Sequence, residues 1–575
     1  MNLPSPAIIA QSAVRRLPRL ALLLFGVAYV LPGFVGRGPW KSADITAFGV
    51  MQQLATTGSG WLQPGLMGQT AGFDSLLPYW LGAAAIRLLP FLDPAFAARL
   101  PYIALLALTL LGTWYSVYYL ARSPQAQPVA FAFGGEARPA DYARAIADGG
   151  LLALLACLGL ARLSHEATPA LAQLSFSTLL FFALANLPRK RIGAWVSSAI
   201  AIVGMALSGA PALAMILGVG GAILMALDTG KPSALRARSV DVAWVLLICL
   251  ATAALVSALG LWRWRVAYSH VFEIKSMTRL LLWFTWPAWP LAIWTLWRWR
   301  FQLKHLTANP HLSLPLWFVA VATCTTWFSG LSDRALLLSL PAMATLAAFA
   351  LPTLRRSVSA FVDWFTLVFF SVGALIIWVV WTSLQTGMPA QPAINVARLA
   401  PGFTHVFSGL AVAFALMASL VWASLVKWRA GRHRAAIWKS MALPAGGAIL
   451  CWLLVMTLWL PLLNFARSYE PLVLKVRDLI GTPQCVHYHG LTRAQGAAFE
   501  FHGKFKLLPS SKVMANASSQ AAPCDWLIVD TQALGTLKQD VDMTTWQYQA
   551  TVRRPSDNNE DIVLYKRTAQ ANAKI

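Results

Sequence analysis

Charged residues are scarce in this chain. Only 12% of its 575 residues are charged, whereas 58% are hydrophobic and 26 are tryptophan. So few charges exclude a water-soluble globule for most of the chain. The sequence also lacks a P-loop, a dinucleotide-binding fingerprint, a metal-protease helix and a Cys-x-x-Cys pair, which argues against ATP-driven transport and redox chemistry.

Long apolar runs are present instead, and each is close to the roughly 17–25 residues that a helix needs to cross a bilayer. We predict thirteen membrane-spanning helices, near residues 17–35, 97–121, 149–163, 168–187, 192–208, 211–227, 241–261, 279–298, 313–329, 335–352, 362–383, 404–426 and 440–460. The run 76–91 is interpreted as a helix at the membrane surface, because a further crossing there would place the basic loops outside.

The net charge of +24 lies mostly in short loops between these runs, so we predict no nucleic-acid partner. Under this assignment more basic residues lie on the cytoplasmic side, in loops such as Arg189–Arg191 and Arg355–Arg356, as the positive-inside rule requires. The first run resembles a signal peptide but lacks a cleavage site, and we interpret it as a retained anchor with a cytoplasmic N-terminus. Thirteen crossings then place the C-terminus outside.

The composition after Pro461 becomes that of a soluble domain, so we predict two domains, 1–460 and 461–575. Residues 485–489, 526–530 and 562–565 are typical of strands, and polar stretches between them leave room for helices. We therefore expect a small α/β domain. Cys485 and Cys524 are its only cysteines, and a disulfide between them is expected if the domain is periplasmic.

Acidic residues follow the first span in a polar, turn-rich segment. Asp44 is a candidate general base at the membrane rim, but either it or Ser42 could simply cap the helix predicted over 45–54. Asp74 opens the second surface helix, where it could bind a divalent cation with a partner carboxylate or histidine, or cap the helix.

Further ionisable residues lie on the same predicted external face. His165 and Glu166 occupy a very short loop between two spans, where they either act in a site or are charges that the interface tolerates. Arg334 is a candidate for binding phosphate, and an ion pair with the adjacent Asp333 is the structural alternative.

The external loop 263–279 mixes cations with aromatic residues. Arg265 and its basic neighbours, Arg279 included, could bind the phosphate of a lipid-linked donor, or could anchor the loop among lipid headgroups. His270 in the same loop is a candidate metal ligand together with Asp74. His487 and His489 share one face of a predicted strand, but two histidines without a third ligand are weak evidence for a metal site.

These features together resemble the aminoarabinose transferase and protein O-mannosyltransferase group of C-type membrane glycosyltransferases. The resemblance rests on the acidic residue after the first span, the turn Gly60-Trp61-Leu62-Gln63-Pro64, the acidic residue before Pro78-Tyr79-Trp80, and a basic residue ahead of Leu340-Pro341. Thirteen spans with an external C-terminal domain are similar to the aminoarabinose transferase branch in particular.

The resemblance implies roles for individual residues. Asp44 matches the family's acceptor-side acidic residue, Asp74 the second acidic position, and Arg334 the basic residue before Leu-Pro, while Glu166 stands where the family often has Asp. The family's Lys-Pro after the second acidic position is Ser75-Leu76 here, so Lys41 or Arg334 would have to replace the missing lysine. The Lys-Gly common between spans five and six is likewise Ser-Gly.

The resemblance therefore implies a bacterial inner-membrane glycosyltransferase with its active site on the periplasmic face. It would transfer a sugar from a polyprenyl-phosphate donor to a lipid (lipid A-like), glycan or protein acceptor, among membrane lipids, and a divalent metal ion is the one cofactor left open. We expect Asp44, assisted by Glu166 and His165, to deprotonate or orient the nucleophile. The donor phosphate would be bound by Arg334, Lys41 and Arg265.

Two alternatives belong to other classes. A transporter or flippase of lipid-linked glycans would also need a cavity and external charges. It predicts ionisable residues at mid-span, whereas Asp363 lies near the end of a predicted span. A non-catalytic assembly partner would use the C-terminal domain for binding.

Overall fold

The structure is a computed structural model that describes residues 5–69, 75–228, 235–262, 274–329, 332–431, 436–510, 524–557 and 560–568. The chain forms two compact units. Unit 1 comprises Met1–Val35, Pro101–Ile377 and Gly409–Thr457. Unit 2 comprises Gly36–Leu100, Trp378–Ser408 and Leu458–Ile575, and therefore groups the first polar segment with the C-terminal region. The predicted division near residue 461 stays a prediction.

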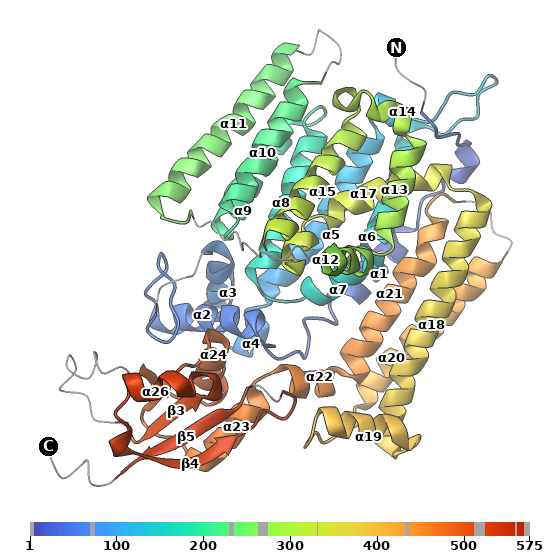
Figure 1. Ribbon diagram of the computed structural model, residues 1–575. Coiled ribbons are helices and arrows are strands. Elements are labelled where there is room, and N and C mark those ends of the chain that lie inside the picture. The colour runs from blue at the N-terminus through green and yellow to red at the C-terminus, as the bar shows by residue number, and fades with distance from the viewer. Residues whose placement is uncertain are drawn as a thin grey trace. The chain divides into compact units, whose positions relative to one another are not determined.

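Unit 1 is helical, and each predicted apolar run corresponds to one helix or to two consecutive helices (Figure 1). Its principal helices are α1 (Arg19–Val30), α5 (Leu100–Ala121), α6 (Pro139–Ala156), α7 (Leu158–Leu163), α8 (Pro169–Asn186), α9 (Arg191–Leu207), α10 (Pro211–Ala226), α11 (Leu235–Ala258), α12 (Ile274–Phe284), α13 (Ala288–Arg298), α14 (Arg300–Leu303), α15 (Pro310–Phe328), α16 (Asp333–Leu337), α17 (Leu340–Ala350), α18 (Arg356–Thr386), α20 (Gly409–Ala430) and α21 (Lys439–Leu458).

Within the described residues, seven helices are long and apolar enough to cross a bilayer, and four more apolar helices are shorter. Helices of this length bury all their backbone hydrogen-bonding groups internally, which hydrocarbon demands. The protein is therefore a multi-pass membrane protein. The count of thirteen crossings stays a prediction, because several of the predicted spans are short or broken.

Three runs that were predicted as single spans are each divided into two helices in the structure, so the prediction of one continuous helix was wrong for each of them. Residues 149–163 belong to α6 and α7, which are separated by the extended backbone of Cys157. The run 279–298 breaks between α12 and α13, at Pro287, as a proline without an N–H and with a fixed φ dictates. The Leu158 N–H at the first break donates to the carbonyl of Trp286 at the second break (3.1 Å), so one hydrogen bond links the two breaks. The third run, 335–352, is divided between α16 and α17.

Helices α8, α9, α10 and α11 lie side by side in Figure 1 and pack in consecutive pairs. The predicted separation of the spans 192–208 and 211–227 is confirmed by the turn between α9 and α10. The Gln173 side chain from α8 donates to the carbonyl of Ser208 (2.8 Å), which holds this turn against the neighbouring helix.

Unit 2 contains the predicted surface helices and the C-terminal region. Its helices are α2 (Ala43–Thr57), α3 (Leu77–Leu88), α4 (Pro94–Ala97), α19 (Ala390–Leu399), α22 (Leu460–Arg467), α23 (Glu470–Ile480), α24 (Arg493–His502) and α26 (Leu534–Asp540). Helix α2 packs on both α3 and α24. A Cβ at Gly49 would lie 2.6 Å from the Cβ of Ala497, so glycine permits the close approach of α2 to α24.

The C-terminal sheet has five strands in the order β2-β1-β3-β5-β4. They are β1 (Val486–His489), β2 (Leu507–Pro509), β3 (Trp526–Asp530), β4 (Trp546–Val552) and β5 (Ile562–Arg567). Strand β1 is parallel to β2 and β3, whereas β5 is antiparallel to β3 and β4. The three predicted strands are confirmed as β1, β3 and β5 of this small C-terminal sheet.

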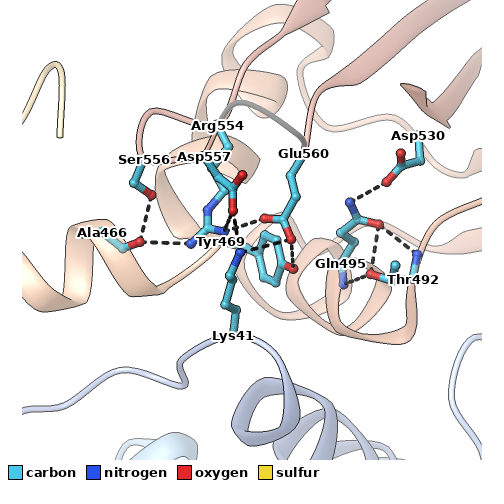
Figure 2. Close-up of polar contacts among 10 residues, drawn as sticks. All are labelled: Lys41, Ala466, Tyr469, Thr492, Gln495, Asp530, Arg554, Ser556, Asp557 and Glu560. Carbon is cyan, nitrogen blue, oxygen red and sulfur yellow. Dashed lines mark hydrogen bonds and ion pairs between the residues drawn. The ribbon is translucent and has the colours of Figure 1, made fainter. Parts of the chain in front are cut away.

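Local bonds explain why these elements form where they do. Thr492 and Gln495 form a capping box at the start of α24, and Gln495 also donates to Asp530 at the end of β3 (2.7 Å), as Figure 2 shows. The predicted disulfide between Cys485 and Cys524 is present, with Cα atoms 5.3 Å apart, and it joins the segments leading into β1 and β3.

Candidate active site

Asp44 lies in the first turn of α2, and its side chain is only 2% exposed. Its Oδ2 accepts a hydrogen bond from the Trp40 N–H (3.2 Å) and from Nη2 of Arg37 (3.2 Å), and Nη2 of Arg99 lies 3.6 Å away. Of the two residues predicted as possible caps, Ser42 occupies the N-cap position without a side-chain cap bond, and Asp44 lies within the first turn. The carboxylate is instead the centre of a buried ion cluster.

The two arginines of the Asp44 cluster also make further contacts within the cluster. Arg99 donates to the backbone carbonyl of Arg37, and the Arg37 guanidinium lies 3.9 Å from the centre of the Trp40 ring. Two guanidinium groups and a helix N-terminus compensate the cost of burying a carboxylate. The result is a rigid anion held at a fixed place, which is the property that a group orienting a nucleophile needs.

Lys41, predicted to bind phosphate, is engaged in ion pairs. Its Nζ lies 2.7 Å from Oδ2 of Asp557 and 3.2 Å from Oε1 of Glu560, both near the end of the β4–β5 loop (Figure 2). Each of these side chains retains partial exposure.

Glu166 and Arg334 form an ion pair in unit 1. Arg334 Nη2 donates to Oε2 of Glu166 at 2.9 Å, and this partner is 168 residues away in sequence. The alternative partner, the adjacent Asp333, is not the residue that Arg334 contacts in the described part of the chain. The turn between α7 and α8 supplies Glu166, and the short helix α16, capped by Ser332, supplies Arg334.

His165 is fully buried, in contrast to its charged neighbour. Its Nε2 lies 3.0 Å from the Tyr29 carbonyl and its Nδ1 lies 2.8 Å from the Ala161 carbonyl. The Trp452 ring packs on it with centroids 4.5 Å apart. These contacts fix the turn that carries Glu166 against α1 and α21.

An open cavity of about 650 Å³ lies among α7, α12 and α16 in unit 1. Arg162 and Arg279 line it together with Asp333, which directly precedes Arg334, and Trp283 and Phe284 add aromatic surface. Arginine binds phosphate through planar, bidentate hydrogen bonds, so this lining suits an anionic headgroup beside an apolar chain. Arg279 was among the predicted phosphate-binding cations.

Arg162 was missed as a site residue by the sequence analysis. The signal was available, because Arg162 lies four residues before Glu166 and on the same predicted face. What could not be foreseen is that α7 would face α12.

A second cavity, of about 450 Å³, lies where α8, α10, α11 and α15 meet. Among its basic residues, Arg189 donates to the backbone carbonyls of Tyr119 and Arg122, whereas the other two form ion pairs, Arg191 with Asp241 (2.9 Å) and Arg238 with Asp228 (3.0 Å). The four ion-paired residues lie in regions predicted to be cytoplasmic. We therefore regard the cavity with Arg162 and Arg279 as the candidate phosphate site.

Three predicted site residues, Asp74, Arg265 and His270, lie outside the described residues. Within the described ranges, no three His, Cys, Asp or Glu side chains group as a metal site would require. His489 hydrogen-bonds to Thr536 (3.1 Å), while His487 packs against the Trp546 ring.

The chain matches no protein-family model and no curated protein. Among solved structures it is similar to ArnT from Cupriavidus metallidurans bound to undecaprenyl phosphate, with 14% identity and a TM-score of 0.58 over 96% of this chain and 99% of that chain. The apo state of the same protein gives 15% identity and a TM-score of 0.57 over 95% and 96%.

A third match is the arabinosyltransferase EmbB from Mycobacterium smegmatis, with 17% identity and a TM-score of 0.37 over 81% of this chain and 43% of that chain. The predicted resemblance to the aminoarabinose transferase group of C-type membrane glycosyltransferases is thus confirmed at the level of the fold: this chain has the fold of ArnT along nearly its whole length.

Proposed function

We propose that this membrane protein is a glycosyltransferase that takes a sugar from a polyprenyl-phosphate donor. In this proposal the acceptor is a lipid, glycan or protein on the periplasmic face of a bacterial inner membrane, the N-terminus is cytoplasmic, and the C-terminal domain is periplasmic. The observation that supports it most is a fold shared over 96% of the chain with a protein crystallised with undecaprenyl phosphate.

In this proposal the donor phosphate is bound in the open cavity among α7, α12 and α16 of unit 1. Arg162 and Arg279 would bind the donor phosphate, and the isoprenoid chain would lie along the aromatic side chains. Arg334 lies one residue from the cavity lining and would add a third guanidinium, oriented by Glu166. His165 takes a structural role in this scheme, since it holds the turn that supplies Glu166.

The proposed reaction is an inverting displacement at the anomeric carbon. The acceptor oxygen or nitrogen forms the new bond to that carbon, the bond to the phosphate oxygen breaks, and polyprenyl phosphate leaves with the electron pair. The arginines stabilise the negative charge of the leaving phosphate. Asp44 orients the nucleophile and accepts its proton. Arg265 remains a proposed phosphate ligand, and Asp74 and His270 remain proposed ligands of a divalent cation.

The test is transfer of labelled sugar from polyprenyl phosphate by the purified, reconstituted protein. We expect Arg279→Gln and Arg334→Gln to lower the transfer rate by about 100-fold each, as loss of a group that stabilises transition-state charge does. Arg553→Gln is the control, because Arg553 is 83% exposed and contacts Asp561 far from these residues in sequence.

Translocation of a lipid-linked glycan without any transfer would contradict the proposal and favour a flippase. The acceptor is best found by mass spectrometry of lipid and glycan extracts from a deletion strain, which should lack one glycan modification.

A further inference from the structure

The segment that leads into α2 is held by the C-terminal region of the same unit. The Asn464 side chain in α22 accepts from the Gly38 N–H (3.1 Å) and from Nε1 of Trp40 (2.9 Å), and donates to the carbonyl of Gly36 (3.0 Å). The Lys41 N–H donates to the carbonyl of Arg467 (2.8 Å). Contacts with α22 therefore hold residues 36–41, the segment that shortly precedes Asp44.

The β4–β5 loop holds the same segment through side chains (Figure 2). Lys41 pairs with Asp557 and Glu560, and Glu560 also binds the buried Arg554 and accepts from the Tyr469 hydroxyl (3.1 Å). Burial raises the pKa of Tyr469 above its ordinary value, so its hydroxyl keeps its proton and donates.

Arg554 anchors this loop to the rest of the C-terminal region. Its guanidinium donates to the carbonyl of Ala466 (2.9 Å) and lies 4.8 Å from the centre of the Tyr469 ring. Ser556 donates to the same carbonyl (2.8 Å). The loop is thus fixed to α22 independently of Lys41.

The charges of Lys41, Arg554, Asp557 and Glu560, which we call the clasp, are balanced: two cations face two anions. A phosphate bound to the Lys41 ammonium would bring its negative charge close to the two carboxylates, and like charges at that distance repel. The ammonium is therefore better suited to hold the segment than to bind a donor.

We infer that Asp557 and Glu560 are positioning residues that, through Lys41, fix the entry of α2 and hence the carboxylate of Asp44. This assigns Lys41 a role different from the predicted phosphate binding. The inference depends on the proposed function only for its effect on catalysis; the effect on α2 is independent of any activity.

Steady-state kinetics separate the two roles of Lys41. As a positioning residue, Lys41→Met lowers kcat about five- to tenfold, the scale of a lost partly buried ion pair, with little change in the KM for the donor. Asp557→Asn combined with Glu560→Gln gives the same loss, adding Lys41→Met to it changes little more, and Lys41→Arg restores most of the rate.

Phosphate binding by Lys41 predicts the opposite pattern. Lys41→Met would then raise the donor KM, and removal of the two carboxylates would lower it because the ammonium is released. That result would overturn the inference. Arg553→Met is the matched control, since Arg553 lies in the same loop and pairs with Asp561 (3.4 Å) outside the clasp.

Hydrogen–deuterium exchange tests the structural half without any assay of activity. Amides of α2 should exchange about fivefold faster in Lys41→Met and in the double carboxylate variant than in wild type, and at the wild-type rate in Arg553→Met. Unchanged exchange in both clasp variants would overturn the inference. Faster exchange in a protein that transfers no sugar would leave the clasp standing and remove the proposed function instead.

Discussion

The buried cluster of Asp44, Arg37 and Arg99 should be essential to the stability of unit 2. Replacing Asp44 with asparagine removes the carboxylate that contacts two guanidinium groups whose side chains are 1% and 2% exposed. Asparagine keeps the volume but supplies no charge. The repulsion between the two buried cations is then compensated less well.

The expected cost is about 3–5 kcal/mol, the range measured when one partner of a buried ion pair is removed. An exposed pair gives a contrasting value. Arg16, 56% exposed, pairs with Asp141 (2.9 Å), and Arg16→Met should cost less than about 1 kcal/mol. If burial determines the cost, Asp44→Asn should lower the free energy of unfolding by several kcal/mol more than Arg16→Met does.

The assay is denaturation of the purified protein by SDS from mild detergent micelles, followed through the helical signal or through protease sensitivity of unit 2. The double variant Asp44→Asn/Arg99→Met should recover part of the loss, since it removes one unpaired buried cation. Asp44→Asn with wild-type stability would refute the reasoning. For the same reason, activity measurements on Asp44 variants must be normalised to folded protein.

Three further predictions concern other parts of the chain. Burial raises the pKa of Glu500 from 4.5 to about 7, so its contribution to the stability of unit 2 is most favourable below about pH 4.5 and falls as the pH rises toward 7. Glu500→Gln should remove this contribution and stabilise the protein at pH 8 by up to about 3 kcal/mol relative to wild type, measured as thermal midpoints at pH 5 and 8. A Cβ at Gly33 would lie 2.2 Å from Cδ2 of His165, so Gly33→Ala should destabilise unit 1 by about 1–3 kcal/mol in the SDS assay, and an unchanged midpoint would contradict this packing. The disulfide between Cys485 and Cys524 closes a loop with a sequence separation of 39, and its reduction should cost the C-terminal region about 4 kcal/mol, measured by urea denaturation with and without reductant.

Much of the fold could be predicted from the sequence because its signals are local. Apolar runs located most of the membrane helices, and local sequence pattern located three of the five strands of the C-terminal sheet. Pro287 offered a local signal for one break, although a single span was predicted over 279–298. The break at Cys157 had no such signal. No proline occurs there, Gly159 lies two residues beyond Cys157, and the break is stabilised by a hydrogen bond to Trp286, more than a hundred residues away.

The candidate site was predictable only as a list of residue types. Sequence pattern selected Asp44, Glu166 and Arg334, but it did not indicate their partners. Asp44 contacts Arg37 and Trp40 nearby in sequence as well as the distant Arg99, and Arg334 pairs with Glu166 across 168 residues. Lys41 shows the limit most clearly. Its partner Asp557 is 516 residues away, and it is from this pairing that we infer a positioning role in place of the predicted phosphate binding.

We propose that the cavity with Arg162 and Arg279 binds the phosphate of a polyprenyl carrier. Native mass spectrometry of the purified protein with added undecaprenyl phosphate measures this directly, with Arg553→Gln as the control. We expect a bound lipid in wild type and control and at least about tenfold weaker binding in Arg162→Gln/Arg279→Gln. Equal binding by all three proteins would contradict it.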